Sequence, residues 1–151
     1  MANQFDRFRR AKAEGYRSGL EVRVANQLKE AGVAFEYEPF RIPFTQPSKP
    51  RHYTPDVVLH NGIVVETKGR FLTADRAKHK MIQEQHPGLD LRFVFSNPNT
   101  RISKQSKTTY AMWADTHGFK YARGDIPAEW TAEPPNKASL AVIARLRKDE
   151  K

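Results

Sequence analysis

DVVLHNGIVVETK, residues 56–68, is the stretch that decides the fold of this chain. Two apolar triplets, 57–59 and 63–65, flank Asn61-Gly62, a residue pair typical of tight hairpin turns. Such short apolar runs are typical of strands that are buried on both faces. The stretch therefore predicts a β-hairpin in the interior of a sheet.

The length of the hairpin loop decides which charged residues share a face of that sheet. A two-residue loop would pair Val57 with Glu66 and would put Asp56 on the other face from Glu66. A three-residue loop, 60–62, would pair Asp56 with Glu66 and would give Gly62 the left-handed conformation. A metal ion shared by Asp56 and Glu66 therefore requires the longer loop, or a bulge with the same effect.

The charged end of the hairpin suits metal-assisted chemistry. Glu66 and Lys68 lie on one face because side chains alternate along a strand. Carboxylates from both arms could hold Mg²⁺, and a neighbouring lysine could polarise an attacking water or stabilise charge on a phosphate. A plain structural interpretation remains open, with Asp56 capping a strand and Glu66 and Lys68 forming a solvated pair.

The composition favours a polyanionic partner. The chain has 151 residues, with 26 Lys and Arg against 17 Asp and Glu, a formal charge of +9. A basic surface attracts nucleic acid, although a generic basic protein has the same charge. Cysteine is absent, which excludes disulfides and thiolate metal sites, and no apolar run approaches the roughly 20 residues of a membrane span. The basic N-terminus lacks the apolar core of a secretory signal.

That N-terminal segment, residues 1–17, is predicted to be a mobile arm or a marginal helix. Its cations are candidates for binding DNA phosphates, and the alternative is a solvated tail. They are Arg7, Arg9, Arg10, Lys12 and Arg17.

Periodicity predicts a mixed α/β domain with helices packed on a sheet. Five prolines between residues 39 and 55 exclude a helix there and indicate an extended or looped segment. We expect helices at 18–31, 73–85 and 108–117, strands at 33–37, 91–95 and 119–122 beside the hairpin, and a helical pattern in the basic tail that follows residue 136.

Glu21 has two interpretations. Ser18 and Glu21 have the spacing of a capping box, in which the glutamate side chain reaches back to the N-cap amide. From the residues alone, this structural role is the one we favour.

The chain also resembles the phage endonuclease I family, the Holliday-junction resolvases of lytic tailed phages. The resemblance covers about residues 17–135 and consists of blocks that follow one another in order. They are RSGLE (17–21), FEYE (35–38), YTPD (53–56), NGIVVETKG (61–69), KH (78–79), EQHPGLDLRFVF (84–95), HGFKYA (117–122) and IPAEW (126–130).

The resemblance implies a restriction-endonuclease-like fold, a mixed central β-sheet flanked by helices, with a PD-(D/E)xK motif. It also implies a functional role for Glu21 besides any capping. The implied catalytic residues are Glu21, Asp56, Glu66 and Lys68; the implied metal ligands are Asp56, Glu66, Glu21 and the Thr67 backbone carbonyl, with Glu36 as an accessory acid.

The resemblance further implies a domain-swapped homodimer with composite active sites. Residues 39–52 would form the bridge between chains, so that Glu21 of one chain would join Asp56, Glu66 and Lys68 of the other. The implied domains are an arm at 1–17, a nuclease domain at 18–135 and a basic tail at 136–151.

The implied function is resolution of four-way and other branched DNA by paired nicks that leave a 5′-phosphate and a 3′-hydroxyl. Two Mg²⁺ ions per site are expected, with Mn²⁺ as a substitute, and neither a nucleotide cofactor nor a membrane partner. The expected location is the cytoplasm of an infected host cell. The alternatives are a non-catalytic junction-binding protein, a nuclease of this fold that acts on nicked or mismatched DNA, and a structural interaction protein.

Overall fold

The computed structural model describes residues 18–46 and 49–150, so the five cations of the expected N-terminal arm lie outside the described residues. The helices are α2 (Gly19–Glu30), α3 (Thr73–Gln85), α4 (Tyr110–His117), α5 (Ala128–Ala132) and α6 (Lys137–Asp149). The strands are β1 (Phe35–Tyr37), β2 (Ile42–Gln46), β3 (Lys49–Tyr53), β4 (Val57–Leu59), β5 (Ile63–Lys68), β6 (Asp90–Phe95) and β7 (Tyr121–Arg123). None of these helices has the length and apolar character that crossing a membrane requires.

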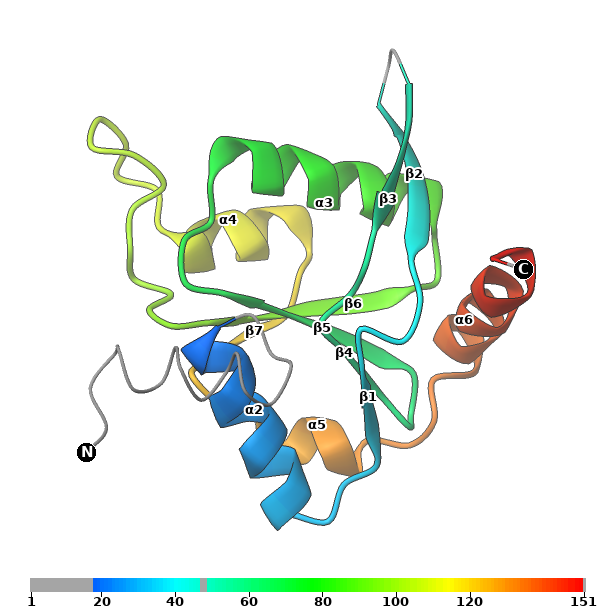
Figure 1. Cartoon of the computed structure of the whole chain (residues 1–151). Coiled ribbons are helices and arrows are strands. Elements are labelled where there is room, and N and C mark those ends of the chain that lie inside the picture. The colour runs from blue at the N-terminus through cyan, green and yellow to red at the C-terminus, as the bar shows by residue number, and fades with distance from the viewer. Residues whose placement is uncertain (1–17, 47–48, 151) are drawn as a thin grey trace.

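The centre of the fold is a five-stranded mixed sheet in the order β1-β4-β5-β6-β7. Strand β4 pairs antiparallel with β1 and β5, whereas β6 pairs parallel with β5 and β7. Helices α3 and α4 cover one face of the sheet, and α2 and α5 cover the other (Figure 1). The expected α/β class with a helix-flanked mixed sheet is confirmed.

The hairpin of β4 and β5 has the longer of the two loops considered above. Val57 pairs with Val65 and Val58 with Val64. Asp56 lies one residue beyond this ladder. Gly62 has a φ of +94°, and its amide donates to the Leu59 carbonyl at 3.0 Å. The three-residue loop that a shared metal requires is therefore present.

Alternation along the strands divides the core between the two faces of the sheet. Val58 and Val64 join an aromatic-rich cluster under α3 and α4, whereas Val57 and Val65 join a smaller cluster under α2 and α5. Helix α6, which lies in the segment expected to be a basic tail, buries Val142, Ile143 and Leu146 in the aromatic-rich cluster. The apolar stripe of that segment therefore belongs to the core of the folded domain.

The proline-rich segment forms a second, two-stranded sheet. Strands β2 and β3 pair antiparallel, with Ile42 opposite Tyr53, and the hairpin extends beside α3 (Figure 1). Ile42, Phe44 and Tyr53 are buried against the main core. Within this single chain the segment thus folds back on itself, while the strand conformation agrees with the expected extended backbone.

Candidate active site

Asp56 immediately precedes β4 and is 2% exposed. One of its carboxylate oxygens, Oδ2, accepts hydrogen bonds from both the backbone amide and the hydroxyl of Thr67, each at 2.9 Å. Thr67 lies between Glu66 and Lys68 on β5. These two bonds tie the orientation of the aspartate to the strand that carries the other candidate residues.

Glu66, next to Thr67 on β5, is a second buried acid. Tyr53 of β3 donates a hydrogen bond to Glu66 Oε2. Burial and the negative charge of Asp56 raise the pKa of Glu66 to about 8, although Lys68 and the bond from Tyr53 act in the opposite direction. Two buried carboxylates that disfavour each other's charge make a site in which a bound cation would be stabilised.

Lys68 follows at the carboxyl end of β5, with its ammonium group beside Glu66. The Nζ atom lies 3.6 Å from Glu66 Oε1 and 3.2 Å from Asp75 Oδ1. Asp75 is in the first turn of α3, and its other oxygen accepts from the Leu72 amide at 3.2 Å. Lys78, one turn further along α3, is 4.0 Å from Asp75 Oδ1. Asp75 therefore caps α3 and also orients a lysine pair at the edge of the site.

Glu21 reaches the same region from α2, on the other side of the sheet. Oxygen atoms of Glu21, Glu38 and Asp56 all lie within 4.8 Å of one another, an arrangement that could hold a metal ion. Tyr37 donates a hydrogen bond to Glu21 Oε2. Ser18 accepts from the Glu21 amide at 3.1 Å, so the serine half of the expected capping box forms while the glutamate carboxylate contacts the candidate site.

Glu38 is a candidate ligand that the sequence did not indicate. The strand ends at Tyr37, and Glu38 takes a φ of +46°, which is uncommon for a residue with a side chain. Its amide donates to the Asp56 carbonyl at 3.0 Å, which holds the turn against the start of β4. A sequence pattern carries no signal for such a backbone turn.

The structure places Glu36 away from this cluster. Its side chain is 53% exposed, and its carboxylate pairs with Arg147 of α6. The accessory role of Glu36 and the ligand role of the Thr67 carbonyl both stay predictions.

His79 packs against Tyr53, the residue that binds Glu66. It is fully buried on α3, where its ring packs edge-on against Tyr53 and Phe93 with centroids about 5 Å apart. Its Nδ1–H donates to the Asp75 carbonyl at 2.8 Å. Because Tyr53 binds Glu66, the histidine ring helps to fix the position of that carboxylate.

The burial of His79 predicts a pH-dependent stability. Burial lowers its pKa from 6.5 to about 3. Below pH 6.5 the unfolded chain takes up a proton that the folded chain excludes, so the free energy of unfolding should fall as pH drops toward 3. This residue should contribute a slope of up to about 1.4 kcal/mol per pH unit.

Denaturant titrations of the wild type and of His79→Gln across this pH range would measure that contribution. We expect the free-energy difference between the two proteins to shrink as pH falls, because glutamine does not titrate. A difference that stays constant with pH would contradict the prediction.

Comparison with known proteins identifies the family of this chain. The model of the family described as phage endonuclease I matches residues 1–151. Endonuclease I of Escherichia phage T7 is 49% identical over 134 residues, which cover 89% of this chain and 90% of that protein. Endodeoxyribonuclease 1 of Enterobacteria phage T3 is 46% identical over 119 residues, which cover 79% and 78%. The chain therefore belongs to the phage endonuclease I family and is an endonuclease.

Proposed function

We propose that this protein is a Mg²⁺-dependent, structure-selective endodeoxyribonuclease that resolves four-way and other branched DNA by paired nicks. The observation that carries the proposal is a group of buried charged residues at one end of the central hairpin, where Asp56 bonds to Thr67 and Lys68 lies 3.6 Å from Glu66. The names of the relatives from phages T7 and T3 support an endonuclease that acts on DNA. The resemblance to junction-resolving enzymes supports the branched substrate.

The residues present fit a divalent metal. Glu21, Glu38 and Asp56 offer oxygen atoms within 4.8 Å of one another. Burial and the charge of Asp56 raise the pKa of Glu66, and a bound cation would favour its charged form. Carboxylate oxygens are the ligands that Mg²⁺ prefers. Bound there by Asp56, Glu66 and Glu21, with Glu38 as a further candidate, Mg²⁺ would stabilise negative charge on the phosphate during hydrolysis.

The protein's own groups would orient the reactants. Tyr53 fixes one oxygen of Glu66, and Thr67 fixes one oxygen of Asp56. Lys68 Nζ, held between Glu66 and Asp75, is positioned to orient the attacking water or to stabilise charge on the phosphate oxygens. Attack by water at phosphorus with loss of the 3′-oxygen would leave a 5′-phosphate and a 3′-hydroxyl.

The proposal includes a homodimer with exchanged segments, because two sites related by a twofold axis suit paired nicks on a symmetric junction. Domain swapping replaces contacts within a chain by the same contacts between chains. In such a dimer, residues 39–52 would extend rather than fold back. The contacts of α2 and β1 with Asp56 would then join different chains.

The proposal is tested by cleavage of a labelled immobile four-way junction beside duplexes of matched sequence that are intact, nicked or mismatched. We expect paired nicks on the junction with Mg²⁺ or Mn²⁺, none with EDTA, and much slower cutting of the intact duplex. The ends of the products would be identified by ligation and by phosphatase treatment.

Each other outcome selects an alternative. Tight junction binding without cleavage in any divalent metal would favour a non-catalytic binding protein. Equal cutting of junction and intact duplex would keep the nuclease and remove the selectivity for branches. Preferred cutting of nicked or mismatched duplex would assign a different substrate to the same site.

A further inference from the structure

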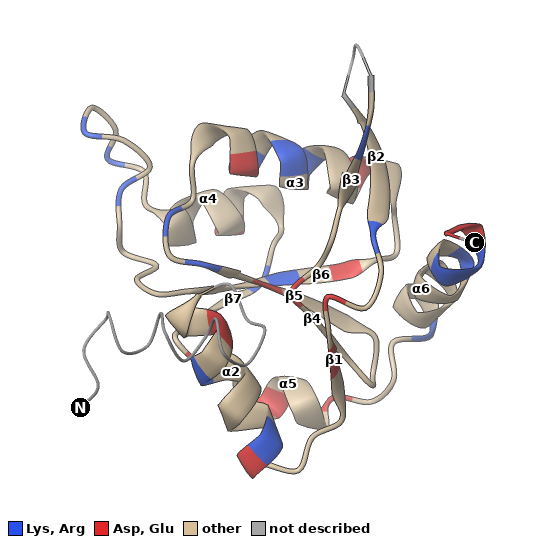
Figure 2. Ribbon diagram, viewed as in Figure 1, with Lys and Arg blue, Asp and Glu red and all other residues tan. Residues whose placement is uncertain are grey.

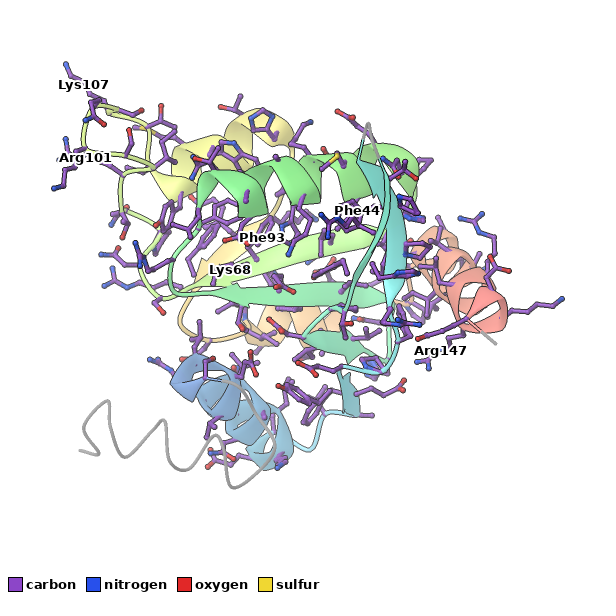
Figure 3. All side chains as sticks on the ribbon, turned by 45° about the horizontal axis from the view of Figure 1, so that its top comes forward. Phe44, Lys68, Phe93, Arg101, Lys107 and Arg147 are labelled. Carbon is purple, nitrogen blue, oxygen red and sulfur yellow. The ribbon has the colours of Figure 1, made fainter. Side chains whose placement is uncertain are left out.

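A basic finger, residues 97–109, projects between β6 and α4. It is the loop with three blue segments and no red one that extends beyond the end of α4 in Figure 2. Its cations are Arg101, Lys104 and Lys107, which are all exposed, and the segment contains no acidic residue. The labelled Arg101 and Lys107 side chains point outward from the finger in Figure 3.

The base of the finger is fixed to the strand exit that carries Lys68. Residues Lys68 and Phe95 are paired at the parallel ends of β5 and β6, and the Ser96 amide donates to the Lys68 carbonyl at 3.0 Å. At the other end of the finger, the hydroxyl of Tyr110 accepts from the Phe71 amide at 3.2 Å. The finger therefore begins and ends next to the candidate active site.

The finger is held in one shape by its own hydrogen bonds. The Ile102 amide donates to the Thr108 carbonyl at 2.8 Å, and the Tyr110 amide donates to the Thr100 carbonyl at 2.9 Å. Arg101 and Thr109 form an antiparallel bridge, and Ile102 packs against the core. A loop that is already ordered loses little conformational entropy when it binds a partner.

The charges of the finger differ from most of those on the helices. On helices α2, α3 and α6, Arg23, Lys80 and Arg147 each pair with a carboxylate. Over residues 18–46 and 49–150, no acidic side chain forms an ion pair with Arg101, Lys104 or Lys107. Three exposed cations on a rigid, acid-free loop are suited to a row of phosphates.

We propose that the basic finger binds backbone phosphates of the DNA arm that enters the active site, on the side of Lys68. The inference rests on the proposed function, since it names the part of the substrate that this surface contacts. The contact carries no sequence information, because it reaches phosphates and not base edges. Its role is to hold the arm so that the cleaved strand lies over the carboxylates.

The test uses the full chain with Arg101→Gln, Lys104→Gln and Lys107→Gln combined. Dissociation constants for an immobile junction would be measured in EDTA at several salt concentrations, so that no cleavage occurs. Each phosphate contact contributes about 0.9 to the slope of log affinity against log salt. We expect the slope to fall by about 2.7 for each finger that contacts the junction, about 5.4 for the proposed dimer, and the affinity at low salt to drop by more than about tenfold.

A matched control removes the same charge elsewhere. Lys137, Arg145 and Lys148 are exposed on α6, which lies on the opposite side of the molecule from the finger in Figure 1. Changing all three to glutamine should leave the slope of log affinity against log salt close to the wild-type slope. Equal losses in both triple variants would show an effect of net charge alone and would overturn the proposal.

The remaining outcomes separate this inference from the proposed function. A finger variant that binds like the wild type would overturn the inference and leave the nuclease intact. A wild type that binds neither junction nor duplex would overturn the proposed function as well. Circular dichroism and unfolding curves would confirm that the finger variant is folded, as its exposed side chains predict.

Discussion

Replacing Glu66 with glutamine is expected to reduce junction cleavage by at least about a thousandfold, close to 4 kcal/mol of transition-state stabilisation. Glutamine keeps the shape of the side chain and an oxygen that accepts the bond from Tyr53. It removes the charge that would bind the metal beside Asp56. Single-turnover cleavage with saturating enzyme would measure the loss without interference from binding.

The same variant should remain folded and should still bind the junction. Burial and the charge of Asp56 raise the pKa of Glu66, so the neutral amide removes an unfavourable charge from the interior of the metal-free protein. Its unfolding midpoint in EDTA is therefore expected to equal or exceed that of the wild type. Glu84→Gln, a change of the same chemistry on the exposed face of α3, serves as the control. Cleavage by Glu66→Gln at the wild-type rate would remove Glu66 from the site.

Co-expression of two chains that are each inactive alone is expected to restore cleavage if the proposed exchange of segments is correct. In a swapped heterodimer of Glu21→Gln and Glu66→Gln chains, one composite site carries both changes. The other site contains a normal Glu21 from one chain and a normal Glu66 from its partner. After random pairing of the two chains, half of the dimers are heterodimers with one intact site each. Activity should therefore rise from background to about a quarter of the wild-type value.

Co-expression of two differently tagged chains would provide the heterodimer, because exchange between folded swapped dimers requires large-scale opening. Only one site is intact, so the products should be single nicks and not paired ones. A heterodimer that stays inactive would indicate that Glu21 and Glu66 of the same chain share each site. A monomer in solution would exclude the swap altogether.

The local elements of the fold could be predicted because their signals are local. The bounds of α3 agree with the predicted helix, and the helix predicted at 108–117 begins two residues late because Thr109 caps it. Helix α5 was missed, since five residues are too few for a periodic pattern. The expected strand at 119–122 is displaced to Tyr121–Arg123, where β7 pairs with β6.

The candidate site also contains residues that local patterns indicate and residues that they do not. The grouping of Asp56, Glu66 and Lys68 at one end of the hairpin could be expected from alternation along strands and from the loop that ends in Gly62. Glu38 and Tyr53 could not be identified in this way. Their positions depend on a backbone turn with positive φ and on the packing of the β2–β3 hairpin, which no residue pattern reports.

By itself, the sequence determined the α/β class, the central hairpin and the three charged residues at its open end, because periodicity and turn chemistry act over a few neighbouring residues. It also carried enough family resemblance to indicate an endonuclease. Tertiary structure alone decided that Glu21 and Glu38 lie beside Asp56, that Tyr53 holds Glu66, and that α6 completes the core. These contacts join residues far apart in the chain, and their positions are set by how whole elements pack.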